Sequence, residues 1–224
     1  MGKHFALTSS DNFKLGAYRA DPAGPAKGGI VLIQEIFGVN HHIRAVCDRL
    51  AGEGYAALAP AVFDRQQPNF ECGYTPDEIA NARKFVANPD FGAMLRDAQA
   101  AIDELKKEGP VAILGFCMGG TISFLAAADG TGLSAAVCFY GGHIIKIVDK
   151  TPKCPTQMHF GEKDASIPMS DVETIKKKHP ECESYVYPDA GHGFCCDERG
   201  SFNEAACKLA WQRSMEFLKQ HVKK

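Results

Sequence analysis

Short apolar segments alternate along the chain with longer stretches in which apolar residues recur at helical spacing. Seven short segments predict β-strands, at 14–19, 30–34, 56–59, 111–114, 135–139, 157–160 and 184–187. Six longer stretches predict helices, at 41–53, 76–86, 91–108, 121–128, 169–179 and 202–222. Apolar strands that are separated by helices are typical of a mostly parallel central sheet flanked by helices on both faces. The pattern therefore predicts the α/β class.

The length of the chain and its even composition predict a single domain over residues 1–224. No repeat, low-complexity segment or long linker divides the 224 residues. The formal net charge is −2, and its charges are dispersed, so we expect neither a nucleic-acid nor a membrane partner. The first residues lack the apolar core of a signal peptide, and no stretch is apolar for long enough to span a bilayer. We expect a cytoplasmic protein, either a monomer or a weak homo-oligomer.

The segment GFCMGG at 115–120 follows the apolar run at 111–114 and precedes a predicted helix. It matches the G-x-S-x-G nucleophile elbow, with Cys117 in the serine position. In such an elbow a sharp turn between strand and helix pushes the middle side chain outward, and small neighbours let the backbones pass. The alternative is a buried core cysteine in a glycine-rich turn. The flanking strand and helix favour the elbow, and with it an α/β-hydrolase-like fold in which Cys117 is the nucleophile.

A cysteine nucleophile needs a base, because at neutral pH only a few per cent of an ordinary thiol is ionised. In this fold the acid and then the histidine follow the nucleophile along the chain, on loops after later strands. Asp164 follows the predicted strand at 157–160, and His192 follows the one at 184–187. Asp164 could also be an ordinary turn aspartate, and Asp189 and Glu162 are its nearest rivals. The order Cys117, Asp164, His192 favours Asp164 as the acid.

His192 is the candidate base among eight histidines because it alone lies in a Gly-His-Gly loop. We expect His41, His42 and His221 to lie on the solvated surface, near a helix start or in the terminal helix. Three other histidines have no residues beside them in the sequence that suggest a chemical role: His4, His159 and His179. The remaining one, His143, follows a Gly-Gly turn.

A hydrolase also needs backbone donors where negative charge develops on the substrate oxygen. In this fold one N–H follows the nucleophile, here that of Met118, and another comes from the loop after the third strand. That loop has the sequence QEIFGVN at 34–40, which makes Ile36 the expected second donor. Glu35 is unusual, because a carboxylate next to a buried strand is costly unless it is paired or protonated. Either it is a salt-bridged or exposed loop residue, or it acts beside the thiol.

Nine cysteines form no C-x-x-C pair, so we expect most to be small apolar residues of a reducing compartment rather than disulfides or zinc ligands. Cys195 and Cys196 are adjacent and close to His192, so a redox or metal role is the alternative to a merely Cys-rich loop. No cluster has the spacing of a metal hydrolase, and no Gly-x-Gly-x-x-Gly follows the first strand. We expect no metal and no cofactor.

Four blocks, at 34–40, 54–60, 115–120 and 190–194, resemble those of the dienelactone hydrolase family, and the resemblance spans nearly the whole chain. It implies a lactone or ester substrate and a triad of Cys117, His192 and Asp164. It further implies that Glu35 contacts the resting thiol, that the Ile36 and Met118 N–H groups bind the oxyanion, and that a thioester forms.

The chain departs from the family at the two arginines that hold the substrate carboxylate in members that degrade chloroaromatic compounds. Cys196 and Ile79 stand at those positions. Arg83 and Arg199 lie nearby and either substitute for them or are solvated surface residues. The substrate therefore stays open, and a carboxylesterase or thioesterase of the same fold is an alternative. A non-catalytic, redox-sensing relative is a second alternative.

Overall fold

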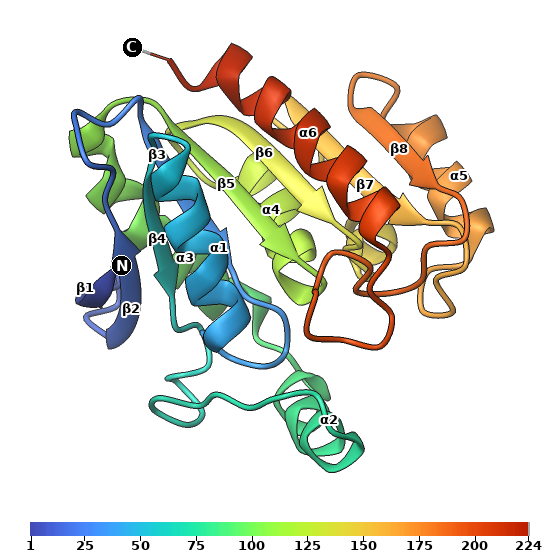
Figure 1. Ribbon diagram of the computed structural model, residues 1–224, viewed down its shortest axis with the longest axis horizontal. Coiled ribbons are helices and arrows are strands. Elements are labelled where there is room, and N and C mark those ends of the chain that lie inside the picture. Colours follow the sequence, from blue (N-terminus) through green and yellow to red (C-terminus); the bar gives the residue numbers. More distant parts are fainter. Residues whose placement is uncertain (224) are drawn as a thin grey trace.

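The computed structural model describes residues 1–223, which build an eight-stranded sheet with helices on both faces (Figure 1). Along the sheet the strands run in the order β1-β2-β4-β3-β5-β6-β7-β8. Only the pairs β1–β2 and β2–β4 are antiparallel, and every other neighbouring pair is parallel. The strands are β1 (Lys3–Thr8), β2 (Lys14–Ala20), β3 (Gly29–Ile33), β4 (Ala56–Pro60), β5 (Val111–Phe116), β6 (Leu133–Phe139), β7 (Thr156–Gly161) and β8 (Glu183–Tyr187).

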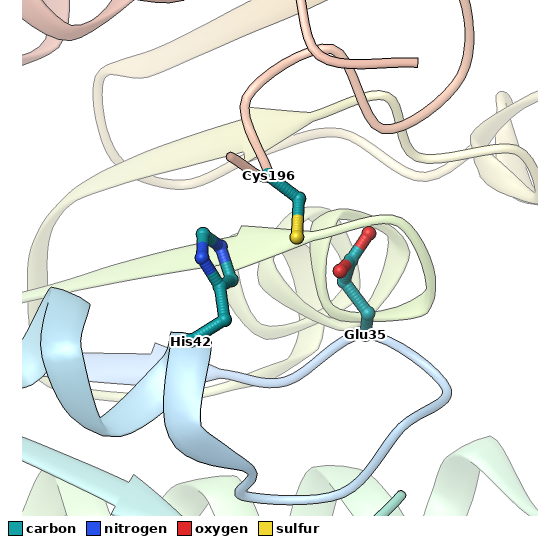
Figure 2. A group of neighbouring side chains, drawn as sticks. All are labelled: Glu35, His42 and Cys196. Carbon is teal, nitrogen blue, oxygen red and sulfur yellow. The ribbon is translucent and has the colours of Figure 1, made fainter. Parts of the chain in front are cut away.

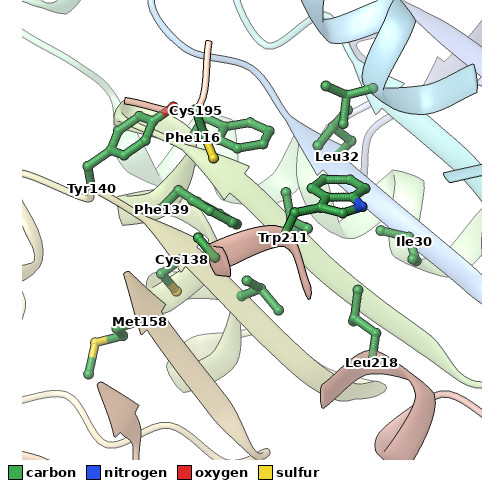
Figure 3. Packing of buried hydrophobic residues seen from close by; sticks show 14 of the residues in the cluster. Ile30, Leu32, Phe116, Cys138, Phe139, Tyr140, Met158, Cys195, Trp211 and Leu218 are labelled. Atoms are coloured by element: carbon green, nitrogen blue, oxygen red, sulfur yellow. The ribbon is translucent and has the colours of Figure 1, made fainter. Parts of the chain in front are cut away.

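The α-helices are α1 (His41–Gly52), α2 (Pro76–Arg83), α3 (Phe91–Leu105), α4 (Met118–Asp129), α5 (Met169–Lys178) and α6 (Glu204–His221). α1 and α6 cover one face of the sheet, and α3 and α4 cover the other (Figure 1). Figure 3 shows Trp211 and Leu218 of α6 beside Ile30 and Leu32 of β3. β3, β4 and β5 are buried along their whole length, which explains why their sequences are apolar without alternation.

The predicted α/β class and the mostly parallel sheet are confirmed, and all thirteen predicted elements exist. Several ends differ. The helix predicted at 121–128 begins at Met118, because it starts directly behind the elbow. The helix predicted at 202–222 begins at Glu204, since the Asn203 side chain accepts a hydrogen bond from the Ala206 N–H and caps it.

Two predicted helices end early, and one strand was missed. The stretches at 76–86 and 91–108 each finish in a 3₁₀ turn, at Lys84–Val86 and Lys106–Glu108. β1 is an edge strand whose side chains are mostly exposed, so its composition carries little apolar signal.

Within residues 1–223, no helix is both long enough and apolar enough to cross a membrane.

The parallel strands bring several loops to one edge of the sheet, because the carboxyl ends of parallel strands lie together. The loops after β3, β5, β7 and β8 carry Glu35, Cys117, Asp164 and His192 respectively. Residues that are far apart in the sequence are thus placed side by side by the topology.

Candidate active site

Cys117 occupies the sharp turn between β5 and α4. Its backbone has φ 55° and ψ −115°, an uncommon conformation for a residue with a side chain. The turn is tight because the strand and helix backbones nearly touch. A Cβ atom on Gly115 would lie 2.1 Å from the Gly119 carbonyl oxygen, and one on Gly119 would lie 2.3 Å from the Ile33 carbonyl oxygen. The structure thus has the geometry of the predicted elbow, including the need for glycine on both sides.

Cys117, His192 and Asp164 form one continuous chain of hydrogen bonds. His192 Nε2 lies 3.0 Å from Cys117 Sγ, and His192 Nδ1 lies 2.7 Å from Asp164 Oδ2. The other carboxylate oxygen, Asp164 Oδ1, accepts a hydrogen bond from the Ser166 N–H at 2.8 Å. The Asp164 side chain is fully buried, whereas that of His192 is partly exposed. The structure therefore brings together the three residues that the sequence singled out.

The two other candidate acids, Asp189 and Glu162, have partners other than His192. Asp189 pairs with Lys163, and Glu162 accepts a hydrogen bond from the Asp189 N–H. Neither carboxylate is hydrogen-bonded to His192.

The electrostatics of the site favour the imidazolium form of His192. Burial lowers the pKa of His192, but the negative charge of Cys117 and the hydrogen bond with Asp164 outweigh it and raise that pKa to about 10. The amino end of α4 begins at Met118, directly behind the sulfur. The partial positive charge at a helix N-terminus stabilises an anion placed there. In the imidazolium form His192 donates from both ring nitrogens, to the Cys117 sulfur and to Asp164.

A cavity of about 490 Å³ opens beside the thiol. Its lining includes every candidate donor and both candidate arginines, together with the thiol and the imidazole: Ile36, Arg83, Cys117, Met118, His192 and Arg199. Ile36 follows β3, and Met118 is the first residue of α4. Sequence reasoning missed His143 and Lys146, which also line the cavity. They lie beyond β6 in a segment with no motif, so no local signal points to them.

Glu35 pairs with Arg199 rather than with the thiol. Its Oε1 accepts a hydrogen bond from Arg199 Nη1 at 2.9 Å, and its side chain is 2% exposed. The thiol of Cys117 is instead hydrogen-bonded to His192. Of the two alternatives drawn from the sequence, the structure shows the salt-bridged carboxylate. Arg199 accordingly lies partly buried, in contact with both Glu35 and the cavity, and is not a solvated surface residue.

The expectation that His42 lies on the surface was wrong. It is 4% exposed, because the second residue of α1 faces the loop that carries His192, and its Nδ1 lies 3.2 Å from Asp197 Oδ1. His41 is exposed, as expected, and lies 2.6 Å from Glu198 Oε1.

Another buried group near the site is Tyr140, which follows β6 with φ 37° and stacks edge-on against the His192 ring at 5.2 Å. Nothing in the sequence marked it.

The structure also joins Cys195 to Cys207 in a disulfide, with 4.7 Å between their Cα atoms. The expectation that the cysteines do not form disulfides is thus wrong for Cys195 and Cys207. The seven other cysteines are free. The pairing links the loop after β8 to α6, and no C-x-x-C spacing could have revealed it.

Comparisons with known proteins agree with this geometry. The model of the dienelactone hydrolase family matches residues 15–222. A Synechocystis protein provisionally named carboxymethylenebutenolidase is 37% identical, over 96% of this chain and 95% of its own length. The carboxymethylenebutenolidase of Pseudomonas putida is 31% identical, over 95% of this chain and 94% of its own length.

Among solved structures, a provisionally assigned dienelactone hydrolase from Klebsiella pneumoniae superposes with a TM-score of 0.84 at 33% identity. The match covers 97% of this chain and 99% of that one. The structure of P91, described as a dienelactone hydrolase-like promiscuous phosphotriesterase, shares the fold with a TM-score of 0.80 at 20% identity. This match covers 98% of each chain. Fold, family model and relatives agree over nearly the whole length, and this chain belongs to the dienelactone hydrolase family.

Proposed function

We propose that this chain, folded as one domain, is a cofactor-independent hydrolase that opens a lactone or ester with Cys117 as nucleophile. The observation that carries the proposal is the unbroken hydrogen-bonded chain from the Cys117 sulfur through His192 to Asp164, at the wall of a cavity. Such a chain supplies what a thiol needs in order to attack a carbonyl: a proton acceptor at bonding distance, held in orientation by a buried carboxylate.

The proposed reaction begins when the Cys117 thiolate attacks the substrate carbonyl carbon and the carbonyl electrons move onto oxygen. The Ile36 and Met118 N–H groups donate hydrogen bonds to this oxyanion. Collapse of the intermediate breaks the ester C–O bond, and His192 gives its Nε2 proton to the departing alkoxide. This leaves a thioester on Cys117. His192 then takes a proton from water, which attacks the thioester, releases the acid and restores the thiolate.

Asp164 acts in this scheme as a positioning residue. Its Oδ2 accepts the Nδ1 proton of His192, which keeps Nε2 directed at the sulfur and favours the imidazolium form. Glu35 neutralises Arg199 at the cavity wall. We propose that it adjusts the charge around the thiol through Arg199 and not by direct contact.

The cations at the cavity favour a substrate that carries a carboxylate. Arg199 is already paired with Glu35, whereas Arg83 has no carboxylate partner among residues 1–223. Lys146 lies on the same cavity. Relatives bear the name carboxymethylenebutenolidase, and their substrate by that name is a lactone carrying a carboxylate. We therefore propose dienelactone or a similar carboxylated lactone, with a neutral carboxylic ester or a thioester as the alternative.

A paired substrate panel tests this assignment. With dienelactone, Arg83→Ala should raise KM by about 10-fold, the equivalent of about 1.4 kcal/mol, because a guanidinium–carboxylate contact is lost. With a neutral aryl ester the same variant should leave KM nearly unchanged. Absorbance assays of both hydrolyses give the measurement, and Lys84→Ala, an exposed neighbour that does not line the cavity, is the matched control. Equal effects on both substrates would argue for the neutral-ester alternative.

The pH profile gives a second test. Because the pKa of His192 is raised to about 10, the imidazolium proton needed by the leaving alkoxide persists through neutral pH and is lost as pH rises through that value. The rate should therefore fall on the alkaline side near pH 10. Asp164→Asn removes one of the interactions that raise this pKa, so the alkaline fall should move to lower pH. An alkaline limb that stays in place in Asp164→Asn would contradict the proposed role of the carboxylate.

A further inference from the structure

Glu35, His42 and Cys196 converge in a buried cluster that is separate from the lining of the cavity (Figure 2). Glu35 comes from the loop after β3, His42 from the start of α1, and Cys196 from the loop after β8. Each is at least nine-tenths buried. One nitrogen, oxygen or sulfur atom from each side chain lies within 4.8 Å of the corresponding atoms of the other two.

Two polar atoms of this cluster lack partners. Glu35 Oε2 and His42 Nε2 are buried and have no hydrogen-bond partner among residues 1–223. The other polar atom of each side chain is bound, Glu35 Oε1 by Arg199 and His42 Nδ1 by Asp197. A buried polar atom without a partner costs free energy, and a half-satisfied cluster of this kind calls for a ligand.

A second group of the same residue types shows the contrast. His179, Glu181 and Cys182 also lie within 4.8 Å of one another. There, however, both imidazole nitrogens are used, Nδ1 by Glu181 at 2.9 Å and Nε2 by the Val148 carbonyl oxygen at 2.7 Å. No imidazole nitrogen in that group is left for a ligand.

We propose that Glu35 Oε2, His42 Nε2 and Cys196 Sγ bind one Zn²⁺ ion. Thiolate, imidazole and carboxylate are the ligands that zinc takes in proteins, whereas Mg²⁺ and Ca²⁺ prefer oxygen ligands alone. Zinc bonds to such atoms at about 2.0–2.3 Å, so atoms this close need only small movements. An S–Zn bond replaces the S–H bond of Cys196, and the proton passes to solvent.

The surroundings suit a divalent cation. Three negative groups, the Cys196 thiolate and the Glu35 and Asp197 carboxylates, together balance the charges of the ion and of Arg199. Asp197 accepts a hydrogen bond from His42 Nδ1, as carboxylates commonly do from a zinc-bound histidine, and this leaves the Nε2 lone pair for the metal. His42, Asp197 and Glu198 form a further group with exposed carboxylates, which provides a route for the ion from the surface.

Zinc in this position joins three segments of the active-site edge. Its ligands lie next to Ile36 and on the same loop as His192 and Arg199, so the ion ties the expected oxyanion loop to the histidine loop. Zn²⁺ should therefore raise the melting temperature, because a ligand that binds only the folded state stabilises it.

Cobalt serves as the spectroscopic probe, in protein carrying Cys117→Ser so that the catalytic thiol cannot bind metal. The protein is purified anaerobically and handled without reductant, which preserves the disulfide. We expect one equivalent of Co²⁺ to bind with a thiolate-to-metal absorption band and to be displaced by Zn²⁺. Cys196→Ser and His42→Gln should each remove the band. Cys182→Ser, in the satisfied group, should keep it.

Asp197→Asn provides a variant at an exposed position that should fold normally even if a buried substitution does not. It should weaken Zn²⁺ binding by about 10-fold in a competition with a chelator. The zinc site is overturned if no Co²⁺ binds, if the band survives Cys196→Ser, or if Asp197→Asn leaves the affinity unchanged. None of these readouts depends on hydrolysis, so they can fail independently of the proposed reaction.

Discussion

Cys117→Ala should lower kcat/KM by about 10,000-fold or more, because the variant keeps the cavity but loses the sulfur that we propose attacks the carbonyl. The loss should fall on chemistry and not on folding. Cys117 is already in a strained backbone conformation that alanine adopts equally, and its sulfur contributes only part of the packing around the turn. Absorbance assays of the hydrolysis of dienelactone and of an aryl ester measure the loss of activity. A urea unfolding curve of the same variant measures its stability.

Cys154→Ala is the matched control, since that thiol is free, partly buried and away from the cavity. It should hydrolyse at nearly the wild-type rate. His192→Ala should lose activity to a similar extent as Cys117→Ala, and mass spectrometry of rapidly quenched wild type should find the acyl group on Cys117. Near-full activity in Cys117→Ala would overturn the mechanism. A folded wild type whose thiol oxidises but that hydrolyses no ester or lactone would favour the redox-sensing alternative.

Local sequence pattern was enough to predict the elbow at Cys117 and the sheet. β5 is buried throughout and must be apolar, and the turn after it requires glycine two residues before and two residues after Cys117. Such requirements can be recognised in a sequence segment of only six residues. Asp164 and His192 were singled out by their order along the chain and by the turn residues around them. The structure brings them together because loops at the carboxyl ends of parallel strands converge.

The partners of charged and polar groups could not be predicted in this way. Glu35 and Arg199 are 164 residues apart, and their ion pair depends on how the loop after β8 folds back over the loop after β3. His42 looked like a surface residue because it lies in the first turn of an amphipathic helix. It is buried because that same loop covers it. The Cys195–Cys207 pairing likewise joins a loop to a helix.

These missed features share one location. The segment between β8 and α6 supplies His192 and Arg199 to the cavity, Cys196 to the proposed zinc cluster, and Cys195 to the disulfide. It has no regular structure whose period could be recognised in the sequence. Contacts with the loop after β3, with α1 and with α6 set its conformation, so apart from His192 its chemistry becomes visible only once the chain is folded.

Gly119→Ala should destabilise the protein by about 3 kcal/mol and lower its activity as well, although alanine is the better helix former. The added Cβ would lie 2.3 Å from the Ile33 carbonyl oxygen and 2.6 Å from that of Gln34, both backbone atoms that cannot turn away. α4 must therefore move away from β3. That shift changes the position of the Met118 N–H relative to the Ile36 N–H, the other expected oxyanion donor. We therefore expect kcat to fall together with the free energy of unfolding. Urea unfolding and hydrolysis rates give the two measurements.

Gly52→Ala is the control, because Gly52 is also helical but a Cβ there meets no atom within 4 Å. Its stability should stay the same or rise by up to about 1 kcal/mol, and its activity should not change. Equal stability changes in the two variants would show that helix propensity governs both positions. A loss confined to Gly119→Ala would show that the elbow depends on the close approach of β3 and α4, which holds the thiol and both expected oxyanion donors in one geometry.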